Sequence, residues 1–521
     1  MLGAGVLSLI FFGLFAFYNA IRHPFVHDDV IFILQNPQIA NLNHWLDAFK
    51  VSPVSDGINT YYRPVLEILY RIEYHFFGPN PAGFHAFNVI VHIINGLLLF
   101  SLLKKFNLTQ RVAWVIACLF LIHPVQTEAV ACISGISNLW MALGVFLALH
   151  AYLKKWYGMS FVLFVIAIFS KEQAILFVPL VMVVDYSRGE KNFRAWVLWV
   201  LAACGLLWLR QCMTNAAVLN NIMASPGELY LRLAAIPRVL EMDLRLILCP
   251  FDLHYYRSTD ILQSNSFSWV LALIILGSVL YVFKRWTQGR YILLLGFGWF
   301  LATLLPVLNI VPLINEYSFI LTPEHFLYLP IVGILIVVVC ASDYFLKRFR
   351  KTLVGLVIGA CLLLSWYQNT FWSSEIALFE RMLQFEPNFG RGHLLLAKAY
   401  YFNHQPEQAD AHYDLAFKIF SNYAKITTNP AAEKFYLGFE KEILFDWAQN
   451  DCVRGNWTKG LDKDMLAIIL TGQDAPLYNN IGFIYMNMGD KKNAYLNFQN
   501  ALRVDPTFTQ ARQNLDQLSP P

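Results

Sequence analysis

Two adjacent carboxylates follow the first apolar segment of the chain by a few residues. They are Asp28 and Asp29, in the run His-Pro-Phe-Val-His-Asp-Asp. An ionised pair near the edge of a bilayer is costly unless it has partners. The pair therefore suggests a site in which one carboxylate is the general base for an acceptor hydroxyl and the other orients the acceptor or the base. The alternative is that the two acids cap a helix.

An arginine follows in the same polar stretch. Arg63 lies in the run Tyr-Tyr-Arg-Pro and is a candidate ligand for a phosphate, because a guanidinium offers two parallel donors to phosphoryl oxygens. Tyr62 beside it is a candidate contact for the acceptor or for the residues around the site. Arg63 could instead form a structural pair with Glu67 or with an aspartate.

Three further short polar runs interrupt apolar segments. The first contains His123 and Glu128, the second Lys171 and Glu172, and the third Glu324 and His325. Ionisable groups in such places are hypotheses for function. Two alternatives stay open, a surface ion pair between Lys171 and Glu172 and simple helix capping by the third run.

Other chemistries lack the residues that they need. The sequence has no Walker loop, no GxGxxG after a strand, no HExxH and no GxSxG, so nucleotide hydrolysis, dinucleotide redox chemistry and standard hydrolase chemistry have no support. A net charge of +4 spread over short loops does not resemble a surface that binds phosphate backbones, and nucleic acid is not an expected partner. The eight cysteines show no CxxC pair and no metal-ligand spacing.

The elements that would position these residues are membrane-spanning helices. Of 521 residues, 57% are hydrophobic and only 14% are charged, whereas soluble domains carry about 25% charged residues. The first apolar run, 2–20, lacks a cleavage signal and is predicted to be a retained helix. Ten more apolar segments predict an all-α, polytopic bundle of about eleven spans, at 84–103, 112–122, 139–152, 161–169, 174–184, 195–209, 267–283, 291–310, 326–344 and 352–366.

Loop charge predicts which side of the membrane each loop faces. Basic clusters follow alternate apolar segments, and the positive-inside rule places them and the amino terminus in the cytoplasm. The first long loop, 21–83, carries the acidic pair and then faces outside, as does everything after Trp366. The segment 231–249 is apolar but contains five charged residues, so it is predicted to lie at the outer interface or to re-enter the membrane.

From Ser373 onward the composition is polar and helical. The clearest repeat has small and aromatic residues at the offsets of the 34-residue tetratricopeptide pattern, namely Tyr478, Ile481, Gly482, Tyr485, Ala494, Phe498, Ala501 and Pro506. We predict roughly three repeats, and domain limits of 1–370 for the membrane part and 371–521 for the repeats. The repeats either form a groove that binds a polypeptide or merely cap the membrane domain.

In their order and spacing, the polar motifs resemble those of a known family. They are Asp28-Asp29 with Asn36-Pro37, Tyr62-Arg63-Pro64, Gly83-Phe84-His85 with Asn88 and His92, His123-Pro124 with Thr127-Glu128, Ser170-Lys171-Glu172, and Glu324 with Tyr328-Leu329-Pro330. This series is similar to that of the transmembrane and tetratricopeptide-repeat (TMTC-type) O-mannosyltransferases and their bacterial relatives. The likeness extends over nearly the whole chain.

The resemblance implies a type C (GT-C) glycosyltransferase, which uses a polyprenyl-phosphate sugar and an active site on the outer membrane face. Asp28 would match the family's catalytic acid, with Asp29 as its acceptor-side partner. Arg63, Lys171 and His325 would face the donor phosphate. Two departures from the pattern stand out: Ser134-Gly135-Ile136-Ser137-Asn138 replaces Ser-Gly-Arg-x-Asp, and His325-Phe326 occupies a place where relatives carry an Arg.

The leading hypothesis is therefore an inverting transfer of a sugar from a polyprenyl-phosphate donor to a hydroxyl on protein. The enzyme would lie in a bacterial inner membrane, with the repeats in the periplasm binding the acceptor. Basic residues or a bound divalent metal would offset charge on the departing phosphate. The residues expected around the acceptor are His123, Glu128, Glu172, Glu324 and Tyr62.

Two alternatives stay open. In one, the chain is a non-catalytic membrane scaffold whose repeats recruit a partner for envelope assembly or secretion. In the other, the chemistry is the same but the acceptor is a lipid or a glycan.

Overall fold

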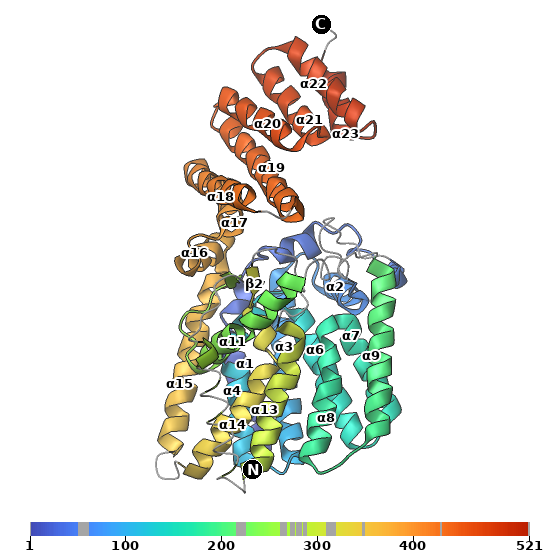
Figure 1. The fold of residues 1–521 in the computed structure, drawn as a ribbon, viewed down its shortest axis with the longest axis vertical. Coiled ribbons are helices and arrows are strands. Elements are labelled where there is room, and N and C mark those ends of the chain that lie inside the picture. Colours follow the sequence, from blue (N-terminus) through green and yellow to red (C-terminus); the bar gives the residue numbers. More distant parts are fainter. Residues whose placement is uncertain are drawn as a thin grey trace. The chain divides into compact units, whose positions relative to one another are not determined.

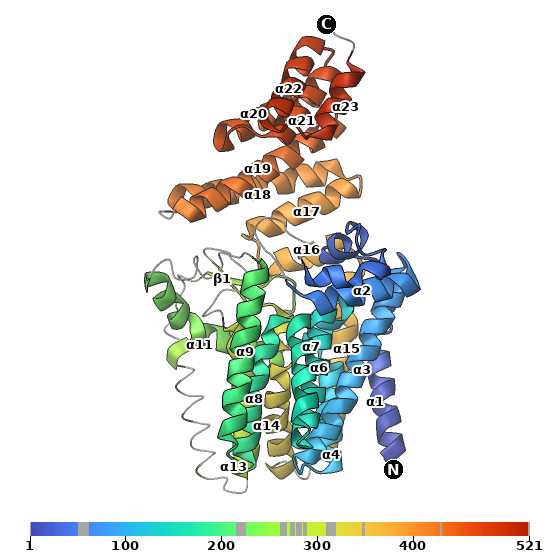
Figure 2. The same cartoon turned by 90° about the vertical axis from the view of Figure 1, so that its right-hand side faces the viewer.

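The computed structural model describes most of the chain. The described residues are 2–50, 62–214, 226–260, 268–270, 273, 277, 284, 289–308, 319–345, 350–427 and 430–518. They fall into two compact units, Met1–Ser374 and Glu375–Pro521, each built almost entirely from helices (Figures 1 and 2). The predicted span at 267–283 lies largely outside these ranges.

Unit 1 contains the apolar helices. The α-helices in the described part of this unit are α1 (Leu2–Phe17), α2 (Pro64–Phe77), α3 (Pro81–Lys105), α4 (Gln110–Ile122), α5 (Thr127–Ala131), α6 (Ile136–Leu153), α7 (Tyr157–Ser170), α8 (Phe177–Ser187), α9 (Phe193–Thr214), α11 (Pro226–Leu248), α13 (Arg290–Leu304), α14 (Pro330–Phe345) and α15 (Arg350–Asn369). Short helical turns join them: η1 (Ala20–Arg22), η2 (Val30–Leu34), η3 (Leu42–Phe49), η4 (Pro124–Gln126), η5 (Glu172–Leu176), η7 (Leu305–Val307), η8 (Glu324–Leu327) and η9 (Thr370–Ser373).

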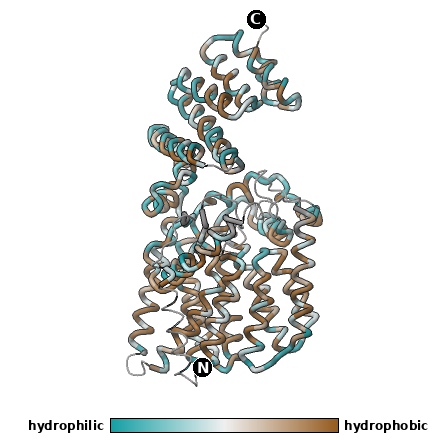
Figure 3. Tube along the Cα trace, viewed as in Figure 1, coloured by the Kyte–Doolittle hydropathy of each residue, from teal (hydrophilic) through white to brown (hydrophobic). Residues whose placement is uncertain are grey.

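Length and hydropathy identify fewer membrane spans than the sequence predicted. Four described helices are long and apolar enough to cross a membrane: Pro81–Lys105, Ile136–Leu153, Arg290–Val307 and Lys351–Ser373. The pair Gln110–Ile122 and Pro124–Ala131, bent by 51°, would make a fifth. These helices are brown along most of their length in Figure 3. The prediction of about eleven spans is not supported, because other apolar helices of unit 1 have only 10–17 residues, whereas a span needs about 20.

One short ribbon of strands departs from the all-helical prediction. β1 (Ser258–Asp260) pairs antiparallel with β2 (Phe319–Leu321), with Ser258 opposite Leu321. The Thr322 N–H donates to the Arg257 carbonyl at 3.1 Å and extends the pairing by one bond. The ribbon therefore holds the segment after α11 beside the segment that leads into η8.

Helices α13 and α14 approach closely through glycine. A Cβ atom on Gly333 would lie 2.3 Å from the Gly296 carbonyl oxygen and 2.5 Å from the Phe300 amide nitrogen. Both neighbours are backbone atoms, which cannot move aside as a flexible side chain can. Small residues at helix contacts let backbones approach in this way in membranes.

We expect Gly333→Ala to destabilise unit 1 by about 1–3 kcal/mol, because overpacking forces the two backbones apart. The matched control is Gly355→Ala in α15, where a Cβ would have nothing within 4 Å. That change should be neutral or slightly stabilising, since alanine favours helix by about 1 kcal/mol over glycine. Unfolding of both purified variants in a detergent titration measures the difference, and equal stability would contradict the close contact.

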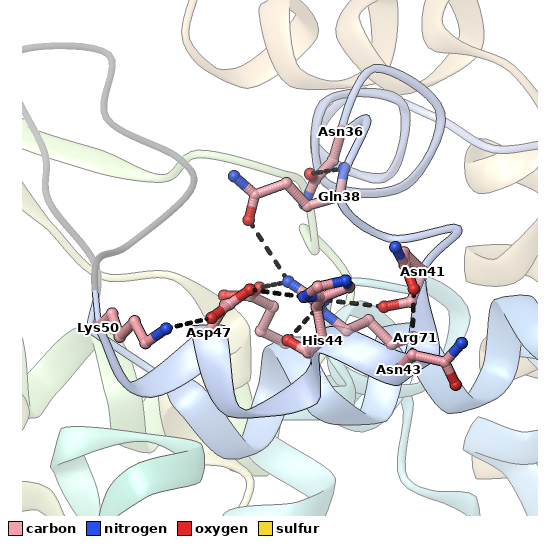
Figure 4. Close-up of polar contacts among 9 residues, drawn as sticks. Asn36, Gln38, Asn41, Asn43, His44, Asp47, Lys50 and Arg71 are labelled. Carbon is pink, nitrogen blue, oxygen red and sulfur yellow. Dashed lines mark hydrogen bonds and ion pairs between the residues drawn. The ribbon is translucent and has the colours of Figure 1, made fainter.

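The first loop is fixed onto α2 by one buried arginine (Figure 4). Arg71 Nη1 donates to the carbonyls of Asn41 at 3.0 Å and His44 at 3.1 Å, and Nη2 donates to Gln38 Oε1 at 3.4 Å and to the Glu67 carboxylate. Only 1% of Arg71 is exposed. One side chain of α2 thus holds η3 and the turn before it, which follow the acidic pair in the chain.

Unit 2 is a series of helical hairpins. Its helices are α16 (Glu375–Phe385), α17 (Gly390–Phe402), α18 (Pro406–Ile426), α19 (Pro430–Val453), α20 (Trp457–Thr471), α21 (Ala475–Asn487), α22 (Lys491–Val504) and α23 (Thr509–Gln517). In the clearest predicted repeat, a Cβ on Gly482 would lie 2.7 Å from the Phe498 ring, and Ala494 and Phe498 are fully buried. The small residues therefore permit the close packing of α21 on α22.

Candidate active site

The two acids of the first loop have different environments. Asp29 is completely buried and accepts backbone N–H groups from Ser134 at 2.7 Å, and from Val26 and Ile133 at 3.4 Å. Burial raises the pKa of Asp29 to about 7, although these N–H donors oppose the shift. Asp28 has a side chain 42% exposed and lies 3.4 Å from His27 Nε2. Asp28 is therefore the accessible acid, and Asp29 anchors the turn that contains Ser134.

That turn depends on a glycine. A Cβ on Gly135 would lie 2.4 Å from the Ala129 carbonyl oxygen, so a larger residue would push the turn out of place. At the far side of the same turn, Asn138 donates from Nδ2 to the Gly135 carbonyl at 3.2 Å. The turn is thus held at one end by Asp29 and at the other by the first residues of α6.

Tyr255 joins the acidic loop to the rest of the site. Its ring meets the His27 ring edge to face at a centroid distance of 5.5 Å. Burial raises the pKa of the Tyr255 phenol well above its usual value, and the negative charges of Asp28 and Glu128 raise it further. Asp28 and Glu128 are therefore both close to this phenol, which comes from the segment between α11 and β1.

Glu128 and His325 form a buried pair. Both carboxylate oxygens of Glu128 are used: Oε2 accepts the His325 backbone N–H at 2.9 Å, and Oε1 lies 2.7 Å from His325 Nδ1. Because a carboxylate only accepts, Nδ1 carries the proton in this bond. Burial lowers the pKa of His325, and the neighbouring Glu128 charge limits that shift. The pair ties α5 to η8.

Lys171 lies next to this pair. It is 4% exposed and donates from Nζ to Asn138 Oδ1 at 2.7 Å, with the Phe326 ring centroid 5.7 Å away. Burial lowers the pKa of Lys171 to about 7, the Arg63 charge lowers it further, and Glu172 and Glu128 oppose both effects. An amine in this environment exchanges its proton near neutral pH.

Arg63 is held by a carboxylate distant in sequence. Its Nε donates to Glu172 Oε2 at 3.0 Å and its Nη2 donates to Oε1 at 2.8 Å, a two-bond pair in which both side chains are mostly buried. Arg63 therefore pairs with Glu172 rather than with Glu67, which bonds Arg71, and Lys171 donates to Asn138. Arg63, Glu172, Lys171, Glu128 and His325 form one connected charge cluster.

Three other candidate residues bond mainly to backbone groups. Tyr62 donates its hydroxyl to the Phe49 carbonyl at 3.0 Å. His123 accepts the Val125 N–H at Nδ1 (3.2 Å), so its Nε2 donates to the Ile247 carbonyl at 3.0 Å. Glu324 accepts the His254 N–H, and burial raises its pKa well above the usual range, with the Glu128 charge adding to this. These contacts position loops around the cluster.

Sequence reasoning missed two members of the site. Tyr255 belongs to a His-Tyr-Tyr-Arg run whose only signal was its position after an apolar helix. Asn138 was noted as a departure from the family pattern, but its contact with Lys171 depends on how α6 and α7 pack. Within the described ranges, no group of three or more His, Cys, Asp and Glu side chains is placed to hold a metal ion.

Comparison with known proteins supplies further information. The family model described as "Tetratricopeptide repeat" matches residues 475–508, which correspond to α21 and α22. This confirms the clearest predicted repeat. Among solved structures, the crystal structure of the APC/C hetero-tetramer Cut9-Hcn1 aligns with 88% of this chain and 90% of its own, at 11% identity and a TM-score of 0.17. A similarity that low says nothing about function.

Curated relatives match the chain in sequence. A protein O-mannosyl-transferase of Caenorhabditis elegans is 24% identical over 80% of this chain and 63% of its own length. Protein O-mannosyl-transferase TMTC1 of Mus musculus is 35% identical over 26% of this chain and 15% of its own. Protein O-mannosyl-transferase TMTC4 of Homo sapiens is 25% identical over 65% of this chain and 55% of its own.

The chain thus spans less than two thirds of the length of these relatives. The names of these relatives confirm the resemblance that the motifs indicated. The chain is a helical, membrane-type protein with a tetratricopeptide repeat, and it is similar to the TMTC protein O-mannosyl-transferases.

Proposed function

We propose that the chain is a glycosyltransferase that moves a sugar, mannose by analogy with the named relatives, from a polyprenyl-phosphate donor to a protein hydroxyl. One observation carries the proposal: the buried cluster of Arg63, Lys171, His325 and Glu128 is connected through Tyr255 to the accessible Asp28. Such a transfer needs two parts. A basic group stabilises the departing phosphate, and a carboxylate accepts the proton of the attacking hydroxyl.

In this mechanism Asp28 takes the proton from the acceptor hydroxyl. The acceptor oxygen attacks the anomeric carbon on the face opposite the phosphate, so the bond from that carbon to the phosphate oxygen breaks with inversion. The phosphate leaves with the bonding electron pair, and Arg63 and Lys171 offset its charge. Lys171 has a pKa near 7, so it is suited to giving a proton to the leaving oxygen at neutral pH.

The proposed location is the outer face of a bacterial inner membrane, in a GT-C-like bundle with a cytoplasmic amino terminus. Support comes from the basic residues at one end of unit 1: Lys105 ends α3, Arg188 follows α8, and Arg290 begins α13. These three helix ends line one cavity through Lys105, Arg188 and Tyr291. Positive residues gather on the cytoplasmic side of membrane proteins. The repeats would then be periplasmic and would bind the acceptor protein.

The test is transfer from a mannosyl polyprenyl phosphate to a Ser/Thr peptide, using the purified chain in proteoliposomes. We expect Arg63→Gln to raise KM for the donor about tenfold to a hundredfold, the range expected for a hydrogen bond to a charged group. Because this change also leaves Glu172 buried without its partner, the control is the double variant R63Q/E172Q.

The double variant should regain the stability that Arg63→Gln loses, but not its affinity for the donor. If the double variant binds donor normally, Arg63 only neutralises Glu172 and does not contact phosphate. Mass spectrometry of proteins and lipids from cells lacking the chain identifies the acceptor, since a lipid or glycan acceptor would leave protein glycosylation unchanged.

A non-catalytic scaffold is the second candidate. The observation that favours it is that both guanidinium donors of Arg63 that face Glu172 are already satisfied, as expected of a structural pair. A scaffold would keep its cellular role when Asp28 is replaced by asparagine, whereas the enzyme would lose it.

A further inference from the structure

A polar cavity lies at the end of unit 1 where basic residues gather. Its volume is about 530 Å³, and its lining includes Lys105, Asn107, Ser187, Arg188, Glu190 and Tyr291. These residues come from the end of α3 and the turn after it, the end of α8 and the turn after it, and the start of α13. None of them belongs to the proposed active site.

The helices that line the cavity indicate its depth in a membrane. Lys105 is the last residue of the apolar helix Pro81–Lys105, and Tyr291 is the second residue of Arg290–Val307, another helix long enough to span. The cavity therefore lies where two hydrocarbon-crossing segments end. Phospholipid phosphates occupy this interfacial level of a bilayer.

The charge of the lining is positive. Lys105 has no acidic partner among the residues that the structure describes, and the positive charge of Lys154 also acts on it. Arg188 pairs with Glu190 at 3.3 Å, but their side chains are 34% and 53% exposed, and exposed pairs of this kind are weak. Two cations thus face a single acid, while the Tyr291 hydroxyl donates to the Phe106 carbonyl at 3.1 Å and braces α13 against α3.

We propose that this cavity binds the phosphate of an anionic phospholipid headgroup, with Lys105 and Arg188 as its ligands. Basic pockets between membrane helices bind such headgroups. The site goes beyond the proposed transfer reaction, and it is tested by binding rather than by activity.

The experiment measures lipid binding to the purified full chain by native mass spectrometry, with phosphatidylglycerol as the probe, phosphatidylcholine as the zwitterionic control and inorganic phosphate as a third arm. Phosphatidylglycerol should bind more tightly than phosphatidylcholine. Each cation removed should cost about fivefold in affinity, so K105Q/R188Q should bind about 25-fold more weakly. The matched control K155Q/K351Q removes two exposed cations that do not line the cavity and should bind normally.

A second variant is expected to change lipid affinity in the opposite direction, and it tests the proposal even if the double variant fails to fold. Glu190→Gln removes the single acid of the lining and frees Arg188, so it should tighten phosphatidylglycerol binding about fivefold. If the control pair weakens binding as much as K105Q/R188Q, or if Glu190→Gln has no effect, the cavity is not the site. If inorganic phosphate displaces the lipid at equal concentration, the ligand is a free phosphate and the lipid assignment is wrong.

Discussion

Asp28→Asn is expected to slow sugar transfer by about 100-fold to 10,000-fold, the range contributed by a positioned general base. Asparagine has the same shape as aspartate but cannot take a proton from the acceptor. The fold should survive, because the Asp28 side chain is 42% exposed and its described ion-pair partner is the neighbouring His27. Initial rates with a mannosyl polyprenyl phosphate in proteoliposomes give the loss, and detergent unfolding of the same preparation checks the fold.

The matched control is Asp47→Asn, which removes an acid from η3 in the same loop. Asp47 pairs with Lys50 at the surface and lies outside the charge cluster, so transfer and stability should both stay close to those of the unaltered chain. A normally folded Asp28→Asn protein that transfers sugar at the usual rate would rule out this mechanism.

Arg71→Met is expected to lower the free energy of unfolding of unit 1 by about 3–5 kcal/mol, the cost of leaving one member of a buried ion pair alone. Arg71 is 1% exposed, and its guanidinium bonds Glu67, two carbonyls and the Gln38 side chain. Methionine fills a similar volume but leaves the Glu67 carboxylate and the carbonyls of Asn41 and His44 without this donor. Detergent unfolding of the purified variant measures the loss.

Two controls separate the buried charge from the loss of an arginine in general. Arg22→Met removes an exposed arginine of the same unit and should change stability by less than about 0.5 kcal/mol. The double variant E67Q/R71M should recover part of the loss, because it no longer buries an uncompensated carboxylate. If Arg71→Met and Arg22→Met are equally stable, the first loop does not depend on this side chain.

The helical class and the repeat at the carboxyl end could be predicted from the sequence, because apolar runs and the 34-residue offsets are local signals, and the order of the polar motifs indicated the resemblance to the TMTC protein O-mannosyl-transferases. The partners of the charged residues could not be predicted in the same way. Arg63 meets Glu172 across 109 positions, and only the packing of α2 against α7 brings them together. The described helices do not support the predicted number of spans, because short apolar helices have the same composition as helices long enough to cross a membrane.

Two residues that are neighbours in sequence, Lys171 and Glu172, bond to different partners. Lys171 has an extended backbone (φ −158°, ψ 130°) between α7 and η5, and its side chain and that of Glu172 have different bonded partners. Lys171 reaches Asn138, while Glu172 reaches Arg63. The expectation of a surface pair between Lys171 and Glu172 was wrong, because both residues are buried.

Two distant residues bond to the segment that joins α5 and α6. Asp29 accepts the Ser134 N–H, and Lys171 donates to Asn138. The seven consecutive residues 132–138 therefore bond both Asp29 and Lys171, which belong to distant segments of the chain. Substitutions at Asp29 and at Lys171 are therefore expected to have non-additive effects on stability, because both side chains bond to the same short segment.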